Sequence, residues 1–252
     1  MKIVAIANQK GGVGKTTTSV NLAAAIAMAG RSVLLIDLDP QANATSGLGL
    51  DVRKQRQTIY DCLTRGAKAK DTIQLTAIAQ LSILPSSPDL AAAEVELVEV
   101  EHRETVLGGC LHDLTGAFEI ALIDCPPTLG LLTINGLVAA TSVLVPVQCE
   151  YYAMEGLGRL MATIQRVQAS LNPGLELEGI LLTMFDVRNT LSKQVAEEIR
   201  GHFKQKVYQS IIPRNVALAE APSYGRPVLL YNAGSSGAHA YLELAKEFLT
   251  HA

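Results

Sequence analysis

The chain has 252 residues, and its 21 Lys and Arg against 24 Asp and Glu give a formal net charge of −3. A content of 48% hydrophobic and 18% charged residues is typical of a globular protein and excludes a chain disordered throughout. No apolar run approaches the roughly 18 residues that a membrane-spanning helix needs. Lys10 ends the N-terminal apolar run too early for a signal peptide. The four cysteines form no CxxC pair. We therefore expect a cytoplasmic protein with reduced thiols, without a zinc site or redox pair.

Charge is unevenly distributed along the chain. Residues 89–124 hold nine acids and one base, whereas residues 186–252 hold eight bases and six acids. Neither stretch is basic enough to indicate nucleic-acid binding by itself, and solvated faces explain both.

Five short apolar segments are predicted to be strands buried on both faces of a parallel sheet. They are Lys2–Ala7, Val33–Asp37, Ile120–Asp124, Ser142–Val147 and Gly179–Met184. Helical spacing is found at Thr16–Ala29, Glu155–Leu171, Leu191–Phe203 and Gly237–Leu249. Strands that alternate with helices predict an α/β fold, with a mostly parallel sheet and helices on both faces. No linker or repeat divides the chain, so we expect one domain over residues 1–252.

The first predicted strand runs into Asn8–Thr17, which reads NQKGGVGKTT. Its end, Gly14-Lys15-Thr16, matches the P-loop pattern G-x-x-x-x-G-K-[ST], although Gln9 replaces the first glycine. Glycines let successive N–H groups point at phosphate oxygens, and the following helix adds its positive N-terminal end. Lys15 supplies a cation for the β- and γ-phosphates, and the Thr16 hydroxyl is placed to bind Mg²⁺. The pattern predicts a single-domain P-loop NTPase.

A second lysine, Lys10, precedes the Gly-Gly pair and gives the variant K-G-G-V-G-K-T-T. This variant resembles the deviant Walker A family, which includes ParA/Soj, MinD and the nitrogenase iron protein. The resemblance implies that Lys10 reaches across a nucleotide-sandwich dimer to the partner's phosphates, as an arginine finger does. A solvated loop lysine is the alternative. The predicted nucleotide-binding residues of this segment are Lys10, Gly11, Gly12, Val13, Gly14, Lys15, Thr16 and Thr17. At Gly12 we expect added bulk to obstruct the phosphates or the dimer face.

Three aspartates stand at or just after strand ends, where sites form in parallel sheets. Asp124 resembles a Walker B aspartate, which holds Mg²⁺ together with Thr16. Asp39 can accept a hydrogen bond from the attacking water and orient it. In the resembled family the matching aspartate has that role, so Lys10, Lys15 and Asp39 are the predicted catalytic residues. Capping or turn hydrogen bonds are the alternative for each acid, and for Asp37 they are an equally good interpretation.

Longer segments narrow the resemblance to ParA/Soj partition ATPases. They read DLDPQANATSG at 37–47, IDCPPTLGLLTING at 123–136, VPVQCEYYAMEG at 145–156, LLTMFD at 181–186 and IPRNVALAEAPSYGRP at 212–227. The resemblance covers nearly the whole chain. It implies an ATPase of chromosome or plasmid partitioning that uses ATP and Mg²⁺, is slow alone and dimerises with ATP. It also implies nonspecific DNA binding on the nucleoid and stimulation by a ParB-type partner. Pro213 and Asn215 match positions near the adenine. The first strand begins at the N-terminus, so we expect no helix-turn-helix extension.

Arg188 occupies the position of a DNA-contacting arginine in the resembled family, whereas Ala217 replaces a basic residue that is frequent there. Each lost phosphate contact weakens DNA binding and lowers its salt slope by roughly one unit. Other bases could substitute, and a solvated helix face is as good an interpretation of them. They are Lys193, Arg200, Lys204 and Lys206.

Three rival functions remain open. A MinD-like membrane-recruited ATPase needs a basic amphipathic C-terminal helix, whereas the apolar stripe around Tyr241 and Phe248 is predicted to pack on the core. A reductase like the nitrogenase iron protein needs cluster ligands, and the spacing of Cys125 and Cys149 does not fit. A non-hydrolysing nucleotide-binding scaffold predicts ATP binding without turnover. We expect no membrane partner.

Overall fold

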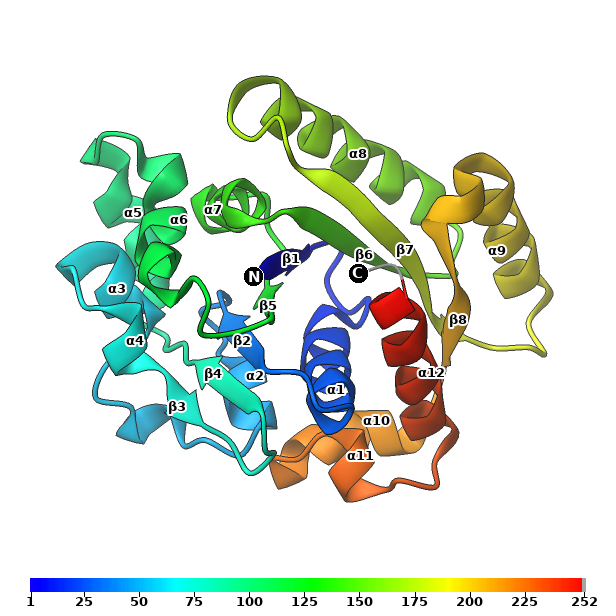
Figure 1. Cartoon of the computed structure of the whole chain (residues 1–252). Helices are drawn as coiled ribbons and strands as arrows, with labels where there is room; N and C mark the ends of the chain where they lie inside the picture. Colours follow the sequence, from blue (N-terminus) through cyan, green and yellow to red (C-terminus); the bar gives the residue numbers. More distant parts are fainter. Residues whose placement is uncertain (251–252) are drawn as a thin grey trace.

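The computed structural model describes residues 1–250, which form one eight-stranded sheet flanked by helices (Figure 1). The strands are β1 (Lys2–Ile6), β2 (Val33–Asp37), β3 (Gln74–Leu75), β4 (Leu81–Leu84), β5 (Ile120–Asp124), β6 (Ser142–Gln148), β7 (Glu176–Phe185) and β8 (Val207–Pro213). Their order across the sheet is β3-β4-β2-β5-β1-β6-β7-β8. Every pair is parallel except β3 with β4 at one edge. The predicted α/β class with a mostly parallel sheet is confirmed.

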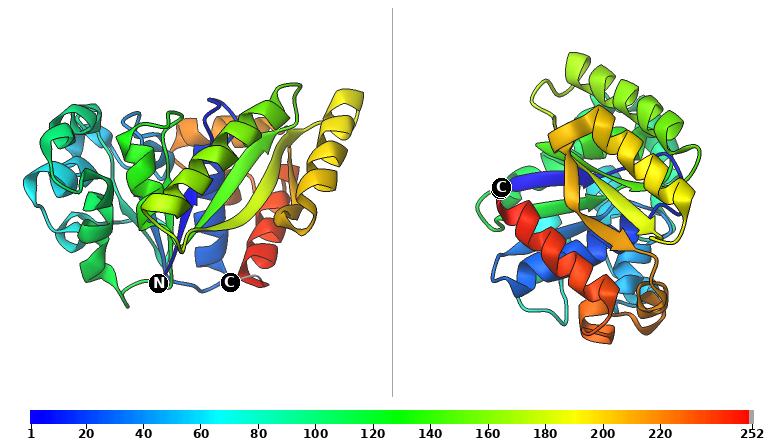
Figure 2. Two further views of the ribbon diagram at one scale, coloured as in Figure 1. Left: turned by 90° about the horizontal axis from the view of Figure 1, so that it is seen from above. Right: turned by 90° about the vertical axis from the view of Figure 1, so that its right-hand side faces the viewer.

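Helices cover both faces of the sheet. The α-helices are α1 (Lys15–Met28), α2 (Asn43–Gly47), α3 (Ile59–Arg65), α4 (Ala69–Thr72), α5 (Leu90–Glu96), α6 (Val106–Leu111), α7 (Leu131–Ala139), α8 (Ala153–Ser170), α9 (Thr190–Phe203), α10 (Val216–Glu220), α11 (Val228–Tyr231) and α12 (Ser236–Thr250). The 3-10 helices are η1 (Val52–Lys54), η2 (Leu97–Glu99), η3 (Arg103–Thr105), η4 (His112–Leu114), η5 (Lys204–Lys206) and η6 (Ala221–Tyr224). Figure 2 shows the sheet between a layer with α8 and α9 and a layer with α1 and α12.

Two cores, one on each face, follow from the alternation of side chains along the strands. In β2, Leu34 and Ile36 join the core under α3 to α9, whereas Val33 and Leu35 join the core with α1 and α10 to α12. All five residues of β2 and of β5 are buried. Both strands have the predicted bounds, because a strand buried on both faces has no polar alternation to blur its ends.

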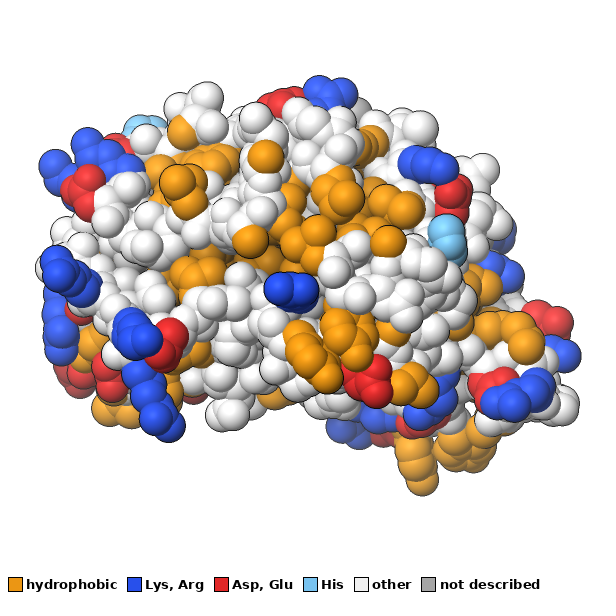
Figure 3. Space-filling view, turned by 90° about the horizontal axis from the view of Figure 1, so that it is seen from below, with side chains coloured by type: hydrophobic (Ala, Val, Ile, Leu, Met, Phe, Trp, Pro, Cys, Tyr) orange, Lys and Arg blue, Asp and Glu red, His pale blue; other side chains and the backbone are white. Residues whose placement is uncertain are grey.

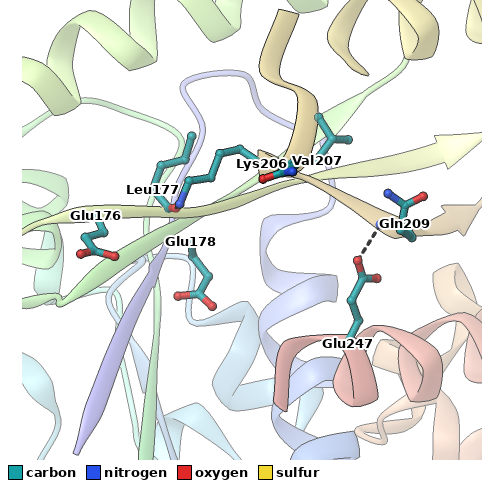
Figure 4. Close-up of a pocket in the computed structure, with 8 residues that line it drawn as sticks. Glu176, Leu177, Glu178, Lys206, Val207, Gln209 and Glu247 are labelled. Carbon is teal, nitrogen blue, oxygen red and sulfur yellow. Dashed lines mark hydrogen bonds between the residues drawn. The ribbon is translucent and has the colours of Figure 1, made fainter. Parts of the chain in front are cut away.

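The C-terminal helix covers one edge of the sheet. The pairing of β7 with β8 is irregular between Val207 and Ile211. There the Glu247 carboxylate of α12 accepts hydrogen bonds from the backbone N–H groups of Gln209 and Ser210, at 2.7 and 2.9 Å (Figure 4). Tyr241 and Phe248 of α12 are fully buried, so the predicted packing of this stripe on the core is confirmed.

One face of the molecule carries a cluster of exposed apolar side chains. Seen from below, apolar side chains gather near the middle of the molecule, on the side where α10 and α11 lie (Figure 3). Val216, Tyr224 and Leu230 of this region are 71%, 64% and 43% exposed. Contiguous apolar surface of this kind is typical of contact sites.

Candidate nucleotide site

The loop of residues 7–14 joins β1 to α1 at the carboxyl edge of the sheet. Gly12 and Gly14 have φ angles of +74° and +86°, a region that side chains disfavour, and Gly14 caps α1. A Cβ on Gly12 would meet no atom within 4 Å. Glycine at this position is therefore required by its backbone angle and not by a neighbouring atom of the same chain, and the expected obstruction of the phosphates or the dimer face stays a prediction.

Lys15, in the first turn of α1, is 7% exposed. Its Nζ donates to the carbonyl oxygen of Lys10 at 3.2 Å, so the ammonium group lies under the loop. Burial lowers the pKa of Lys15, and the negative charge of Asp124 opposes that shift most. An ammonium group with so few fixed partners is ready to bind an anion above the loop.

Lys10 points away from that position. Its side chain is 41% exposed and its Nζ lies 2.7 Å from Oε2 of Glu150, just after β6. Its backbone N–H donates to Oδ1 of Asn8 at 3.0 Å, and the Asn8 amide donates to the Pro146 carbonyl at 2.7 Å. Glu150 was not singled out in the sequence, although it lies in one of the family-like segments.

The three predicted carboxylates differ sharply in their surroundings. Asp124 is fully buried; Oδ1 accepts from the Ser19 hydroxyl at 2.8 Å, whereas Oδ2 has no hydrogen-bond partner within residues 1–250. Burial, and then the charge of Asp37, raise the pKa of Asp124 to about 7. Asp37 accepts from the backbone N–H and hydroxyl of Thr45, both at 2.7 Å. Burial raises its pKa to about 6. These two hydrogen bonds favour the structural interpretation of Asp37.

Asp39 lines the same cavity as the phosphate loop. This cavity, of about 320 Å³, is bordered by Gly11, Gly12, Gly14, Lys15, Thr16, Thr17, Asp39 and Met184 among others. Asp39 is 7% exposed, and its Oδ1 accepts from the backbone N–H of Gln41 at 2.9 Å. Val13 is buried beneath the loop, and its carbonyl accepts from the Thr183 hydroxyl at 2.8 Å.

A second cavity, of about 170 Å³, continues from Gly14 and Thr17 toward α10 and α12. Pro213 and Asn215 both line it, as does Met184. Asn215 caps α10 by accepting from Leu218 N–H at 3.3 Å, and its amide donates to the Ser236 hydroxyl at 2.9 Å. The sequence prediction missed Met184, which borders both cavities.

The basic residues proposed for DNA binding include some at each end of the β7–β8 pair. Arg188 is 86% exposed and bonds Asp186 through Nε and Nη2, at 3.1 and 3.0 Å. Lys204 and Lys206 precede β8, at the amino ends of β7 and β8, and Lys206 donates to the Leu177 carbonyl at 2.9 Å. Ala217 is buried in α10.

Three further observations concern the cysteines, the possible metal ligands and the helices of residues 1–250. Cys125 and Cys149 are buried, and burial raises the pKa of both thiols. Residues 1–250 contain no cluster of three or more metal-ligating side chains of the His, Cys, Asp and Glu types. None of their helices has both the length and the apolar character needed to span a bilayer.

A glycine loop between a parallel strand and a helix, with a buried lysine below it and a carboxylate at the adjoining strand end, defines a P-loop nucleotide-binding protein. The sequence model of a family described as "AAA domain" matches residues 1–177. The "Sporulation initiation inhibitor protein Soj" of Bacillus subtilis is 53% identical over 98% of this chain and 97% of its own length. The "Chromosome-partitioning ATPase Soj" of Treponema pallidum is 46% identical over 98% and 97%. The chain belongs to the ParA/Soj family of chromosome-partitioning proteins.

The fold agrees with solved structures. One is titled cobyrinic acid a,c-diamide synthase from Mycobacterium smegmatis with bound ADP and magnesium. It superposes with a TM-score of 0.87 at 39% identity, covering 100% of this chain and 95% of its own. The likeness therefore extends over the whole sheet and both helical layers.

Proposed function

We propose that this chain is a magnesium-dependent ATPase of chromosome or plasmid partitioning. It dimerises with ATP, binds DNA nonspecifically on the nucleoid in that state and is stimulated by a ParB-type partner. The observation that carries the proposal is the buried Lys15 beneath a glycine loop, together with the Asp124 carboxylate oxygen that has no hydrogen-bond partner in residues 1–250. The names of the relatives support the partitioning role, and the ADP and magnesium of the Mycobacterium smegmatis structure support the cofactors.

Asp124 and Thr16 fit a magnesium site. A buried carboxylate oxygen without a hydrogen-bond partner in residues 1–250 is costly unless a ligand satisfies it. The Thr16 hydroxyl is near enough to lower the pKa of Asp124 against the larger effect of burial. Carboxylate and hydroxyl oxygens are ligands that Mg²⁺ prefers, and bound Mg²⁺ supplies neutralisation of phosphate charge. Direct or water-mediated binding by Asp124 both fit.

The chain's own residues then divide the remaining work. Lys15 and the N–H groups of residues 11–17 bind the phosphates, and Pro213 and Asn215 border the base. The Asp39 carboxylate orients the attacking water by accepting its hydrogen bond. Turnover is slow until the dimer and partner complete this geometry.

Lys10 acts in trans in this proposal. In the single chain it is held by Glu150 at 2.7 Å and lies outside the phosphate cavity. A cation that is half exposed beside the loop can leave a surface ion pair at little cost. The segment from η6 to α11 lies beside the first turn of α1, since Ala221, Pro222 and Arg226 line a cavity with Thr16 and Thr17. This segment also carries the exposed apolar side chains of Tyr224 and Leu230. They offer surface for a second copy.

The test is retention on nonspecific duplex DNA at low and moderate salt, for the apo protein and with ADP or ATP. We expect DNA to be retained only in the presence of ATP. Retention should be stronger in Asp39→Ala and weaker as salt rises. Lys10→Ala tests the trans lysine through ATP-driven dimerisation. Arg188→Ala tests the DNA contact, with Lys246→Ala as a matched control, because Lys246 is also an exposed base paired to an acid.

Two outcomes would contradict the proposal. Absence of DNA retention in every nucleotide state would remove the DNA-binding part, and liposome pelleting would then test a membrane surface. ATP binding without turnover, even with DNA and a ParB-type partner, would favour the scaffold alternative.

A further inference from the structure

Met184 has an unusual backbone for its position. It lies in β7 with φ at +49°, in the left-handed region that bulky side chains rarely adopt. The pairing of β7 with β8 shifts between Leu182 and Phe185, so Met184 lies within an irregular stretch of the strand. Strained residues of this kind persist where the surroundings hold them, and they concentrate at ligand sites.

The irregularity changes the face to which Met184 belongs. In a regular strand Met184 would share a face with Leu182, whose side chain packs in the core under α8 and α9. Phe185 instead packs against that core, and Met184 borders the cavities beside α1 and α10. An irregularity that redirects one side chain is typical of strands next to active sites.

Met184 lies where the two cavities of the site meet. It borders both the cavity of Pro213 and Asn215 and the cavity of the phosphate loop. Its terminal methyl group is 4.0 Å from the position that a Cβ on Gly14 would take. The adjacent Thr183 hydroxyl donates to the Val13 carbonyl at 2.8 Å, so this end of β7 is joined to the loop.

We propose that Met184 is a positioning residue for the nucleoside of the bound nucleotide, with its thioether packed against the sugar and the adjoining edge of the base. This inference rests on the proposed nucleotide binding. A flexible, polarisable thioether suits an irregular, partly apolar ligand surface. The left-handed backbone is what directs the side chain to that surface instead of to the core.

The test compares ATP, ADP and inorganic tripolyphosphate, each with Mg²⁺, by calorimetry on the full chain. Met184→Gly removes the side chain, and glycine adopts the same backbone readily. We expect about 10-fold weaker binding of both ATP and ADP, as for the loss of part of a buried apolar contact, with tripolyphosphate binding unchanged. Met184→Leu keeps apolar bulk and should stay within about 3-fold of the wild type.

Two further variants serve as a control and as a substitute for Met184→Gly. Lys204→Gly is the matched control, because Lys204 has φ at +50° and precedes the amino end of β8, whereas Met184 lies near the carboxyl end of β7; its nucleotide affinity should not change. Met184→Asn also tolerates positive φ and lacks the thioether, so it replaces the glycine variant if that one unfolds. Thermal unfolding of each variant verifies the fold.

The outcomes separate this inference from the proposed function. If the wild type binds no nucleotide, the proposed function fails first. If the wild type binds ATP and Met184→Gly binds it equally well, only the inference is overturned. A parallel loss of ATP and tripolyphosphate would also overturn it, because Met184 would then act through the phosphate loop.

Discussion

Asp124 and Asp186 lie at the carboxyl ends of two parallel strands of one sheet, β5 and β7, yet their surroundings are opposite. Asp124 follows the central strand β5, is fully buried and has a pKa raised to about 7. Asp186 follows β7 near the edge and binds the exposed Arg188, which lowers its pKa to about 2. The carboxylate at the centre of the sheet thus has few hydrogen-bond partners, whereas the one near the edge is already paired with an arginine. The comparison shows that a carboxylate is available to bind a ligand where the fold gives it few hydrogen-bond or ion-pair partners.

We expect the largest effect from a substitution in the central region of the sheet. Lys15→Ala removes the buried cation below the loop, and ATP affinity should fall by roughly 100-fold or more. Lys246→Ala is the control, since its side chain is exposed and paired with Glu243 outside the cavity. Fluorescent-nucleotide titration measures both. Comparable losses in the two variants would mean that burial does not distinguish these lysines.

Asp39→Ala should separate binding from hydrolysis. We expect ATP affinity within a few fold of the wild type and turnover lowered by about 100-fold, because the attacking water loses its acceptor. Phosphate release in single-turnover mode is the measurement, and Asp51→Ala provides an exposed control. Normal turnover in Asp39→Ala would sink the assigned role.

The pH dependence of stability tests the buried carboxylate directly. The pKa of Asp124 in the folded protein, about 7, exceeds the ordinary aspartate pKa of 3.8. Between those values the folded state binds a proton that the unfolded state lacks, so this group lowers stability as pH rises from about 4 to 7. Asp124→Asn should therefore stabilise the apo protein by roughly 1–3 kcal/mol at pH 8, and by less at pH 4.5. Urea unfolding at both values measures this.

Asp186 provides the opposite control for that experiment. Its lowered pKa contributes stability that is present above its unfolded pKa and is lost as pH falls toward 2. Asp186→Asn should thus leave the slope between pH 4.5 and 8 unchanged. A flattening of that slope equal to that of Asp124→Asn would contradict the assignment of the effect to the sheet centre.

We expect the smallest effect from substitutions at Asp186 and Arg188, near the edge of the sheet. Asp186→Asn frees the Arg188 guanidinium and removes a negative charge, so DNA affinity of the ATP state should rise by a few fold. Arg188→Ala should weaken DNA binding and lower the salt slope by about one unit. Anisotropy titrations at several salt concentrations measure both. A double variant that behaves as Asp186→Asn alone would show that Arg188 makes no phosphate contact.

The sequence predicted the centre of the fold better than its margins. Val33–Asp37 and Ile120–Asp124 were found with their observed bounds, because unbroken apolar runs are strong signals. β4, four residues with a buried serine, and β8, an edge strand of mixed burial, were missed. The many short helices between residues 52 and 114 were missed as well, because each is too short for helical periodicity to emerge.

The same contrast applies to the site. Glycine, lysine and aspartate at strand ends carry a recognisable pattern, so the loop and three carboxylates could be predicted. The partner of Lys10 and the place of Met184 could not, because each depends on contacts between distant segments. Methionine has no preference for a left-handed backbone that a sequence could reveal. The roles assigned to the site residues stay predictions until the variants above are measured.

The hydrogen bonds of Glu247 have a consequence for biosynthesis. The acceptor for two edge N–H groups of β8 comes from α12, which follows β8 in the chain, so β8 is synthesised before the side chain that covers it. Until then a nascent chain carries an irregular outer strand with uncovered donors, a template for pairing with another chain. Docking of α12 onto β8 is thus the step that closes this edge of the sheet to other chains.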